Sequence, residues 1–153
     1  MISKENERKF LVSKIPFNLD NYKSLNTKQY YISLNPEIRI RKKNDRYYWE
    51  IKGDGTLSRP TKKFNITKED YKDFKLFKKS NTIIKIRYII PIENDYEAEI
   101  DIYKDYLEGL ITVEVEFNSI KEANNFIPPY WFDKEITFNN KYKNKNLAFY
   151  GLK

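Results

Sequence analysis

The 153-residue sequence contains no cysteine and no histidine. These two absences exclude disulfide bonds, thiolate and imidazole metal ligands, cysteine nucleophiles and any serine–histidine–aspartate triad. Only four glycines occur, so neither a P-loop nor a GxGxxG dinucleotide motif can be written. Any chemistry must therefore rely on carboxylates, lysine, arginine, tyrosine, hydroxyl groups and a metal ion that prefers oxygen ligands.

Long hydrophobic runs are missing as well. The most apolar stretch, residues 83–92, is interrupted by Lys85 and Arg87. No stretch approaches the roughly 20 apolar residues that a membrane-spanning helix needs, and the first residues lack the hydrophobic region of a signal peptide. We therefore expect a cytoplasmic protein without membrane contact, and the length favours a single domain over residues 1–153.

The dominant pattern is an alternation of charged and apolar residues with a period of two, which places them on opposite faces of a β-strand. Such segments begin near residues 5, 37, 46, 58, 83, 99 and 111. Turn residues separate several of them, as at Asn44-Asp45 and at Gly53-Asp54-Gly55. The pattern predicts a mainly β fold of about eight antiparallel strands with a few helices, arranged as a closed barrel or as a sandwich.

Three short helices are predicted between and after the strands. Thr67 is a suitable N-cap for a helix that continues to about Lys79. The sequence Ser119-Ile120-Lys121-Glu122 has the form of a capping box, and Pro128-Pro129 must end the helix that it begins. Residues 139–147 predict a last helix.

The charges on each predicted strand face have mostly one sign. The basic pairs are Arg39/Arg41 and Lys85/Arg87, and the acidic pairs are Glu5/Glu7, Glu99/Asp101 and Glu114/Glu116. Like charges side by side destabilise a sheet, so a solvated face explains any one pair better than it explains all five. Clustered carboxylates favour a divalent cation, and clustered arginine and lysine favour phosphate. A closed barrel with both rows inside and the apolar faces outside would form a site for a metal-bound polyanion.

Six charged motifs occur in order along the chain. They are E-x-E-x-K at residues 5–9, R-x-R at 39–41, K-x-x-G-x-x-x-R at 52–59, K-x-R-Y at 85–88, E-x-D-x-Y at 99–103 and V-E-V-E-F at 113–117. This succession resembles the CYTH superfamily, also called triphosphate tunnel metalloenzymes, and within it the bacterial inorganic triphosphatases. The resemblance implies a closed eight-stranded antiparallel tunnel that hydrolyses inorganic triphosphate to pyrophosphate and phosphate with Mg²⁺ or Mn²⁺.

The resemblance also implies roles for individual residues. The metal-site carboxylates would be Glu5, Glu7, Glu114 and Glu116. The phosphate-binding cations would be Lys9, Arg39, Arg41, Lys52, Arg59, Lys85 and Arg87, with Lys85 also a catalytic candidate. Tyr31 falls where the family has a tyrosine proposed to accept a proton, and a half-buried strand tyrosine without a chemical role is the alternative there.

One segment departs from the family pattern. Close relatives read R-x-E-x-E where this chain has Arg59-Pro60-Thr61-Lys62-Lys63. If the two missing carboxylates help to hold a metal ion or the attacking water, the change weakens hydrolysis and leaves a protein that binds triphosphate or polyphosphate. Alternatively, Pro60 lets this strand slip outward, so that Lys63 lies in solvent.

Other functions share most of these residues. An adenylate cyclase or a thiamine triphosphatase differs from an inorganic triphosphatase mainly in an organic-group pocket at the tunnel mouth. The net charge of +7 and the Tyr47-Tyr48-Trp49 cluster also fit a nucleic-acid-binding barrel, but the acidic pairs would repel a phosphate backbone. We therefore expect a triphosphate ligand and no nucleic acid, while the oligomeric state, a homodimer included, stays open.

Overall fold

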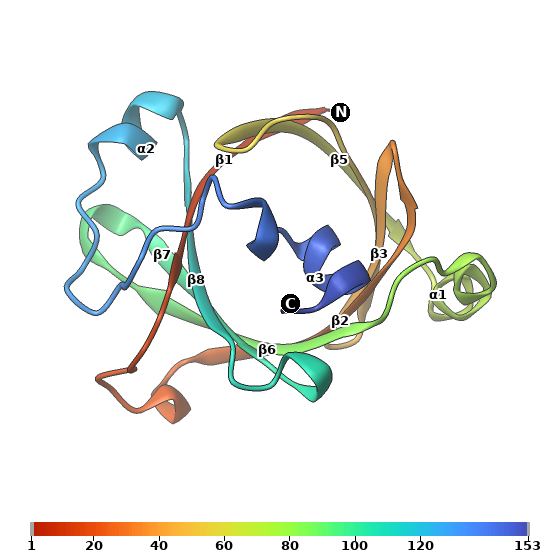
Figure 1. Cartoon of the computed structure of the whole chain (residues 1–153), viewed down its shortest axis with the longest axis horizontal. Coiled ribbons are helices and arrows are strands. Elements are labelled where there is room, and N and C mark those ends of the chain that lie inside the picture. Colours follow the sequence, from red (N-terminus) through yellow and green to blue (C-terminus); the bar gives the residue numbers. More distant parts are fainter. Residues whose placement is uncertain (1, 153) are drawn as a thin grey trace.

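The computed structural model describes residues 2–152, whose strands close into an antiparallel β-barrel (Figure 1). The strands are β1 (Ser3–Leu11), β2 (Lys23–Leu34), β3 (Glu37–Lys43), β4 (Arg46–Lys52), β5 (Ser58–Ile66), β6 (Ile83–Pro91), β7 (Glu97–Tyr103) and β8 (Ile111–Phe117). Around the barrel their order is β1-β5-β4-β3-β2-β6-β7-β8, and β8 pairs with β1 to close it. The barrel is confirmed, and the sandwich alternative is wrong.

The described residues also form three α-helices and several short 3₁₀ turns. The helices are α1 (Lys68–Asp73), α2 (Ile120–Asn125) and α3 (Asn144–Tyr150), and the 3₁₀ turns are Leu19–Asn21, Phe74–Phe77, Glu93–Asp95, Asp105–Leu107 and Asn140–Tyr142. None of the helices within residues 2–152 has the length and apolar character that crossing a membrane requires.

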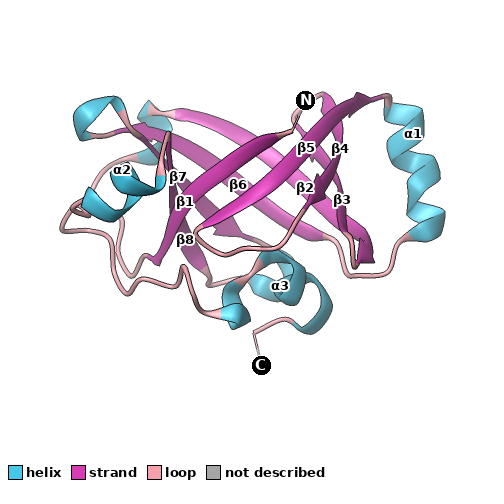
Figure 2. Ribbon diagram, turned by 90° about the horizontal axis from the view of Figure 1, so that it is seen from above, coloured by secondary structure: helices cyan, strands magenta, loops and turns pink. Residues whose placement is uncertain are grey.

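The apolar strand faces point outward and are covered by the helices, as the alternation predicted. Ile40 of β3 packs with Tyr71 of α1 on one flank of the barrel. Val113 and Val115 of β8 belong to a larger core that includes Ala123 of α2, on the opposite flank (Figure 2). All five of these side chains are buried. The main hydrophobic cores therefore lie outside the barrel wall, which leaves its interior for polar side chains.

Helix α3 covers one mouth of the barrel. Seen end-on, α3 projects inside the ring of strands, and after the 90° turn it lies at one end of the barrel (Figures 1 and 2). At that end three inward-facing side chains, Tyr31, Ile83 and Tyr103, cluster with Leu147 and Ala148 of α3. The inward-facing side chains at this mouth are apolar instead of charged, so α3 packs there by burying apolar surface.

The predicted helix after Thr67 forms with the expected cap but is shorter than expected. Thr67 Oγ1 accepts a hydrogen bond from the Asp70 backbone N–H (3.0 Å), and Asp70 accepts one from the Thr67 N–H (3.1 Å). The α-helix ends at Asp73 instead of continuing to about Lys79, and a 3₁₀ turn follows. Leu76 in that turn is 86% exposed, so further α-helical turns would gain little tertiary packing, on which short helices depend.

The other two predicted helices are also present, with shifted bounds. Ser119 Oγ caps α2 by accepting from the Glu122 N–H (3.1 Å), and the helix ends before Pro128-Pro129. The predicted 139–147 helix is divided into a 3₁₀ turn and α3, which runs on to Tyr150. Gly151, with a φ of 67°, ends α3 in the left-handed region that favours glycine.

Candidate active-site tunnel

The barrel interior is lined by ion pairs that join neighbouring strands. Arg39 of β3 lies directly opposite Glu50 of β4 and pairs with it, and Arg41 lies 3.4 Å from the same carboxylate. On the other side, Asp101 of β7 accepts from Arg87 of β6 at 2.7 Å. Such pairing compensates for much of the cost of removing these charges from water. Without ligand, the tunnel is therefore an array of cations held in place by carboxylates.

The tunnel contains two chambers that share part of their lining. The shared residues are Glu7, Arg39, Lys52, Glu114 and Asn144. The chamber beneath α3, here the α3 chamber, is lined in addition by Lys9, Tyr31 and Arg59. The chamber at the opposite end, here the far chamber, is lined in addition by Glu5, Arg41, Arg87 and Glu116. The chambers thus include every predicted site residue except Lys85.

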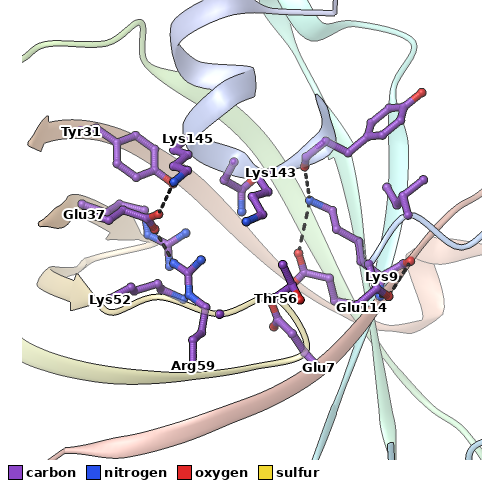
Figure 3. A pocket seen from close by; sticks show the side chains of 16 residues that line it. Glu7, Lys9, Tyr31, Glu37, Lys52, Thr56, Arg59, Glu114, Lys143 and Lys145 are labelled. Atoms are coloured by element: carbon purple, nitrogen blue, oxygen red, sulfur yellow. Dashed lines mark hydrogen bonds and ion pairs between the residues drawn. The ribbon is translucent and has the colours of Figure 1, made fainter. Parts of the chain in front are cut away.

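Cations from distant parts of the chain meet in the α3 chamber (Figure 3). Lys9 of β1 donates to a backbone carbonyl of the C-terminal segment (2.9 Å) and lies 3.7 Å from Glu114. Arg59 of β5 pairs with Glu37 of β3, and Lys145 of α3 lies 3.9 Å from the same carboxylate. The C-terminal segment therefore contributes positive charge to this chamber.

Two of the four predicted metal-site carboxylates are already paired with cations. The Glu5 carboxylate accepts from Lys52 at 2.7 Å. Burial opposes ionisation of Glu5, but the Lys52 ammonium outweighs it and lowers the pKa. For Glu114, burial is likewise outweighed by Lys9 and then Arg87, so its pKa falls to about 2. Both groups are therefore ionised near neutral pH.

The other two carboxylates, Glu7 and Glu116, lie directly opposite each other on β1 and β8. Neither carboxylate makes a hydrogen bond or an ion pair with any other residue in the described part of the chain. Burial raises the pKa of Glu7 to about 7, with the nearby Glu114 carboxylate as the next cause. Burial, and then the negative charge of Glu5, also raises the pKa of Glu116. Among the four predicted metal-site carboxylates, these two are therefore the ones without a hydrogen-bonded or ion-paired cation among the described residues.

The two predicted catalytic residues lie in different surroundings. Tyr31 lines the α3 chamber, and burial raises the pKa of its phenol to about 12, so it keeps its proton at neutral pH. Lys85 is 1% exposed and donates to Asp101 at 2.7 Å, behind the chamber walls. Burial lowers its pKa to about 7, against the opposing effect of Asp101. Tyr31 is therefore the one of the two that faces the cavity.

Some residues that were not predicted from the sequence also belong to the ion pairs and lining of the tunnel. Glu37 and Glu50 hold three of the predicted phosphate-binding arginines, and Lys143 and Lys145 line the α3 chamber. Glu37 could have been found, because it shares the alternation of Arg39 and hence its strand face. The two lysines follow no strand pattern, so only the docking of α3 places them.

Residues 59–63, which depart from the family pattern, keep the regular strand register of β5 in the barrel. Thr61 lies opposite Ser3 of β1 and Lys52 of β4, and Lys63 lies opposite Glu50, without a shift in either pairing. Both side chains line the far chamber. Lys63 therefore faces the far mouth of the tunnel, where its side chain is exposed to solvent as the alternative interpretation expected, although β5 does not slip outward.

Comparison with known proteins gives close agreement over almost the whole chain. The sequence is 33% identical over 147 residues to an inorganic triphosphatase of Nitrosomonas europaea, covering 94% of this chain and 96% of that protein. It is 31% identical over 155 residues to an inorganic triphosphatase of Acetivibrio thermocellus, covering 96% and 94%. No protein-family model matches the sequence.

The fold comparison agrees. The crystal structure of the inorganic triphosphatase NE1496 superposes with a TM-score of 0.70 and 30% sequence identity, over 96% of this chain and 97% of that one. Its agreement covers the barrel strands together with the C-terminal segment that closes the tunnel, because nearly the whole of both chains is aligned. The order of charged motifs, the closed barrel and these relatives lead to one conclusion: the chain belongs to the inorganic triphosphatase family.

Proposed function

We propose that this protein hydrolyses inorganic triphosphate to pyrophosphate and phosphate inside its tunnel, with a divalent metal ion. The observation that carries the proposal is a set of cations lining the same tunnel as Glu7 and Glu116, two carboxylates without an ion-pair partner among the described residues. Triphosphate carries several negative charges along a short chain, and phosphoryl transfer depends mainly on positioning and charge neutralisation. The names of the relatives support the same reaction.

The cations that would bind the phosphate oxygens are those that already line the chambers. They are Lys9, Arg39, Arg41, Lys52, Arg59 and Arg87. Arginine is well suited to this task because its planar fork matches two oxygens at once. Lys85, held by Asp101 behind the wall, would reach a phosphate only after that ion pair opens, so we assign it to the support of Arg87 rather than to direct contact.

The carboxylates of Glu5, Glu7, Glu114 and Glu116, here called the acidic wall, suit a hard divalent cation. Glu7 and Glu116 lie opposite each other on β1 and β8 without an ion pair among the described residues, and Glu5 and Glu114 lie beside them in the far chamber. Residues 2–152 contain no preformed cluster of three or more possible ligand side chains. In phosphate-handling sites, Mg²⁺ or Mn²⁺ is usually bound through one or two carboxylates plus water and substrate oxygens. When bound, the ion would neutralise charge on the phosphates and lower the pKa of a coordinated water.

The chain's own residues would hold the substrate and take up the proton. Attack of water on a terminal phosphorus breaks one phosphoanhydride bond and releases a proton. Tyr31 does not accept it while its pKa is about 12, so the carboxylates of the acidic wall are the better acceptors. The cover of α3 over one mouth limits the entry of bulk water, which strengthens every charge interaction inside.

The direct test is phosphate release from inorganic triphosphate, with ATP in parallel, in Mg²⁺, in Mn²⁺ and in a chelator. We expect release from triphosphate that requires the metal. Preferential turnover of ATP would instead favour an organic triphosphate as substrate, such as that of an adenylate cyclase or a thiamine triphosphatase. No release from either substrate, with or without metal, would contradict the proposal.

Two variants locate the site. Glu116→Gln removes a proposed ligand charge and should reduce metal-dependent turnover, whereas Arg41→Ala should raise KM for triphosphate. One charge-assisted hydrogen bond contributes about 1.5–3 kcal/mol, so we expect changes of roughly tenfold to a hundredfold. Lys62→Met is the matched control, because Lys62 lies on the outward face of β5 over Phe64. An Arg41→Ala variant with the wild-type KM would remove Arg41 from the substrate site.

A second candidate function, binding of triphosphate without hydrolysis, follows from Lys63 at the far chamber. A lysine there places a positive charge where the resemblance to the family implies a carboxylate. If this abolishes turnover, triphosphate should still raise the melting temperature, and the double variant Thr61→Glu/Lys63→Glu should gain activity. Wild-type hydrolysis that the double variant does not improve would exclude this candidate.

A further inference from the structure

The far chamber carries two lysines that the triphosphate site does not use. Lys43 at the end of β3 and Lys63 on β5 both line this chamber, and neither lines the α3 chamber. Lys43 continues the inward face of Arg39 and Arg41 by the same two-residue step. At about 3.4 Å per residue, these three cations form a row of about 14 Å along β3, from the middle of the tunnel to its far mouth.

Neither lysine has a carboxylate of its own among the described residues. Lys43 lies opposite Arg46 on β4 and Thr27 on β2. Burial lowers its pKa to about 7, and the nearby Arg41 and then Arg87 add to that effect. Removal of the Lys43 charge from water without an anion is costly, so an anionic ligand at this point would be stabilised.

Lys63 lies in the same chamber, but at its exposed mouth. It lies opposite Glu50 on β4, but that carboxylate already pairs with Arg39 and Arg41. The Lys63 ammonium lies 4.6 Å from the centre of the Tyr48 ring, a cation–π contact that holds it beside the chamber without neutralising it. The far mouth therefore keeps an excess of positive charge on the β3–β5 side of the tunnel.

We propose that Lys43 and Lys63 form an additional phosphate subsite, which takes the end of a linear polyphosphate chain longer than triphosphate. This inference rests on the proposed function, since in that function cations of both chambers bind the phosphates of triphosphate. The row of cations along β3 is linear, which suits a linear anion better than a compact one. The subsite makes the protein prefer inorganic tetraphosphate to triphosphate.

The test measures binding rather than turnover. Isothermal titration calorimetry in a chelator, at pH 7 and moderate salt, compares tripolyphosphate with tetrapolyphosphate for the wild type and for Lys43→Met, Lys63→Met and Lys62→Met. Because the net charge of +7 favours any more highly charged anion, the ratio of the two affinities in each variant decides the question.

We expect the wild type and the Lys62→Met control to bind tetraphosphate about tenfold more tightly than triphosphate. Lys43→Met and Lys63→Met should reduce this ratio to about one, with the affinity for triphosphate changed by no more than about twofold. Equal loss of both affinities, or the same ratio in all four proteins, would overturn the subsite. Melting temperatures of the variants show whether each is folded.

The outcome separates the subsite from the proposed function. A preference for tetraphosphate that depends on the two lysines, in a protein that hydrolyses neither substrate, would support the subsite and contradict the triphosphatase proposal. Metal-dependent hydrolysis of triphosphate without any lysine-dependent preference would do the reverse.

Discussion

Replacement of Glu7 by glutamine should make the metal-free protein more stable at alkaline pH while it removes activity. Glu7 lies without a cation partner among the described residues, and burial together with Glu114 raises its pKa from the ordinary 4.5 to about 7. One unit of pKa corresponds to about 1.36 kcal/mol, so ionisation of this group in the folded state costs up to about 3 kcal/mol above pH 7. Glutamine keeps the shape and removes that charge.

The stability difference between Glu7→Gln and the wild type should depend on pH. Between about pH 4.5 and 7 the folded protein holds a proton on Glu7 that the unfolded chain has released, so this group's contribution to stability falls as pH rises. Below pH 4.5 the carboxyl is neutral in both states and the variant gains little. Above pH 7 we expect a gain of about 1–3 kcal/mol, since the buried amide itself must still be desolvated.

The assay is thermal unfolding in a chelator, without phosphate, at pH 5 and pH 8. For a domain of this size, about 1–3 kcal/mol corresponds to a rise in Tm of roughly 3–10 °C at pH 8. Glu97→Gln, an exposed carboxylate on β7, is the control and should not change Tm by more than about 1 °C. A Glu7→Gln variant that is less stable than the wild type at pH 8, or whose Tm changes equally at both pH values, would show that ionised Glu7 does not destabilise the folded protein.

Three further predictions concern other parts of the tunnel. Tyr31→Phe should keep kcat for phosphate release within about threefold, because a phenol with a pKa of about 12 holds its proton; a hundredfold loss would make the hydroxyl functional. Lys85→Met leaves Asp101 buried with one cation fewer, so a thermal melt should show a loss of about 3 kcal/mol, and an unchanged Tm would contradict the role of this pair. Gly55→Ala should raise KM for triphosphate, because Gly55 has a φ of 134° and a Cβ there would lie 2.0 Å from a backbone oxygen. Gly109→Ala is the control: Gly109 also has a positive φ, but a Cβ there would meet open space, so this variant tests the effect of φ alone.

Much of the barrel could be predicted from local sequence. The two-residue period identifies the strand faces wherever charged and apolar residues alternate, as in β3 and β8. The helix after Thr67 was harder, because a cap specifies where a helix begins and not how far packing sustains it. For that reason the predicted end at Lys79 was wrong, while the start was confirmed.

The candidate site could be predicted as a set of residues but not as a geometry. The motifs placed Glu5 and Glu7 on one strand face, yet only barrel closure brings Lys52 to Glu5 and leaves Glu7 without an ion-pair partner among residues 2–152. Similarly, Lys85 and Arg87 look equivalent in the sequence. In the structure Arg87 lines the far chamber, whereas Lys85 lies behind the wall against Asp101.

The order of residues along the chain specifies which side chains share a strand face and which chemistry is excluded, because a strand's period is local and because absent residue types cannot act. The tertiary structure decided which charges meet. The pairing of β8 with β1 sets Glu116 against Glu7, and the docking of α3 places Lys145 beside Glu37. The energy of a charge depends on partners and burial that are distant in sequence, so compensated and uncompensated groups could be told apart only after the barrel had closed.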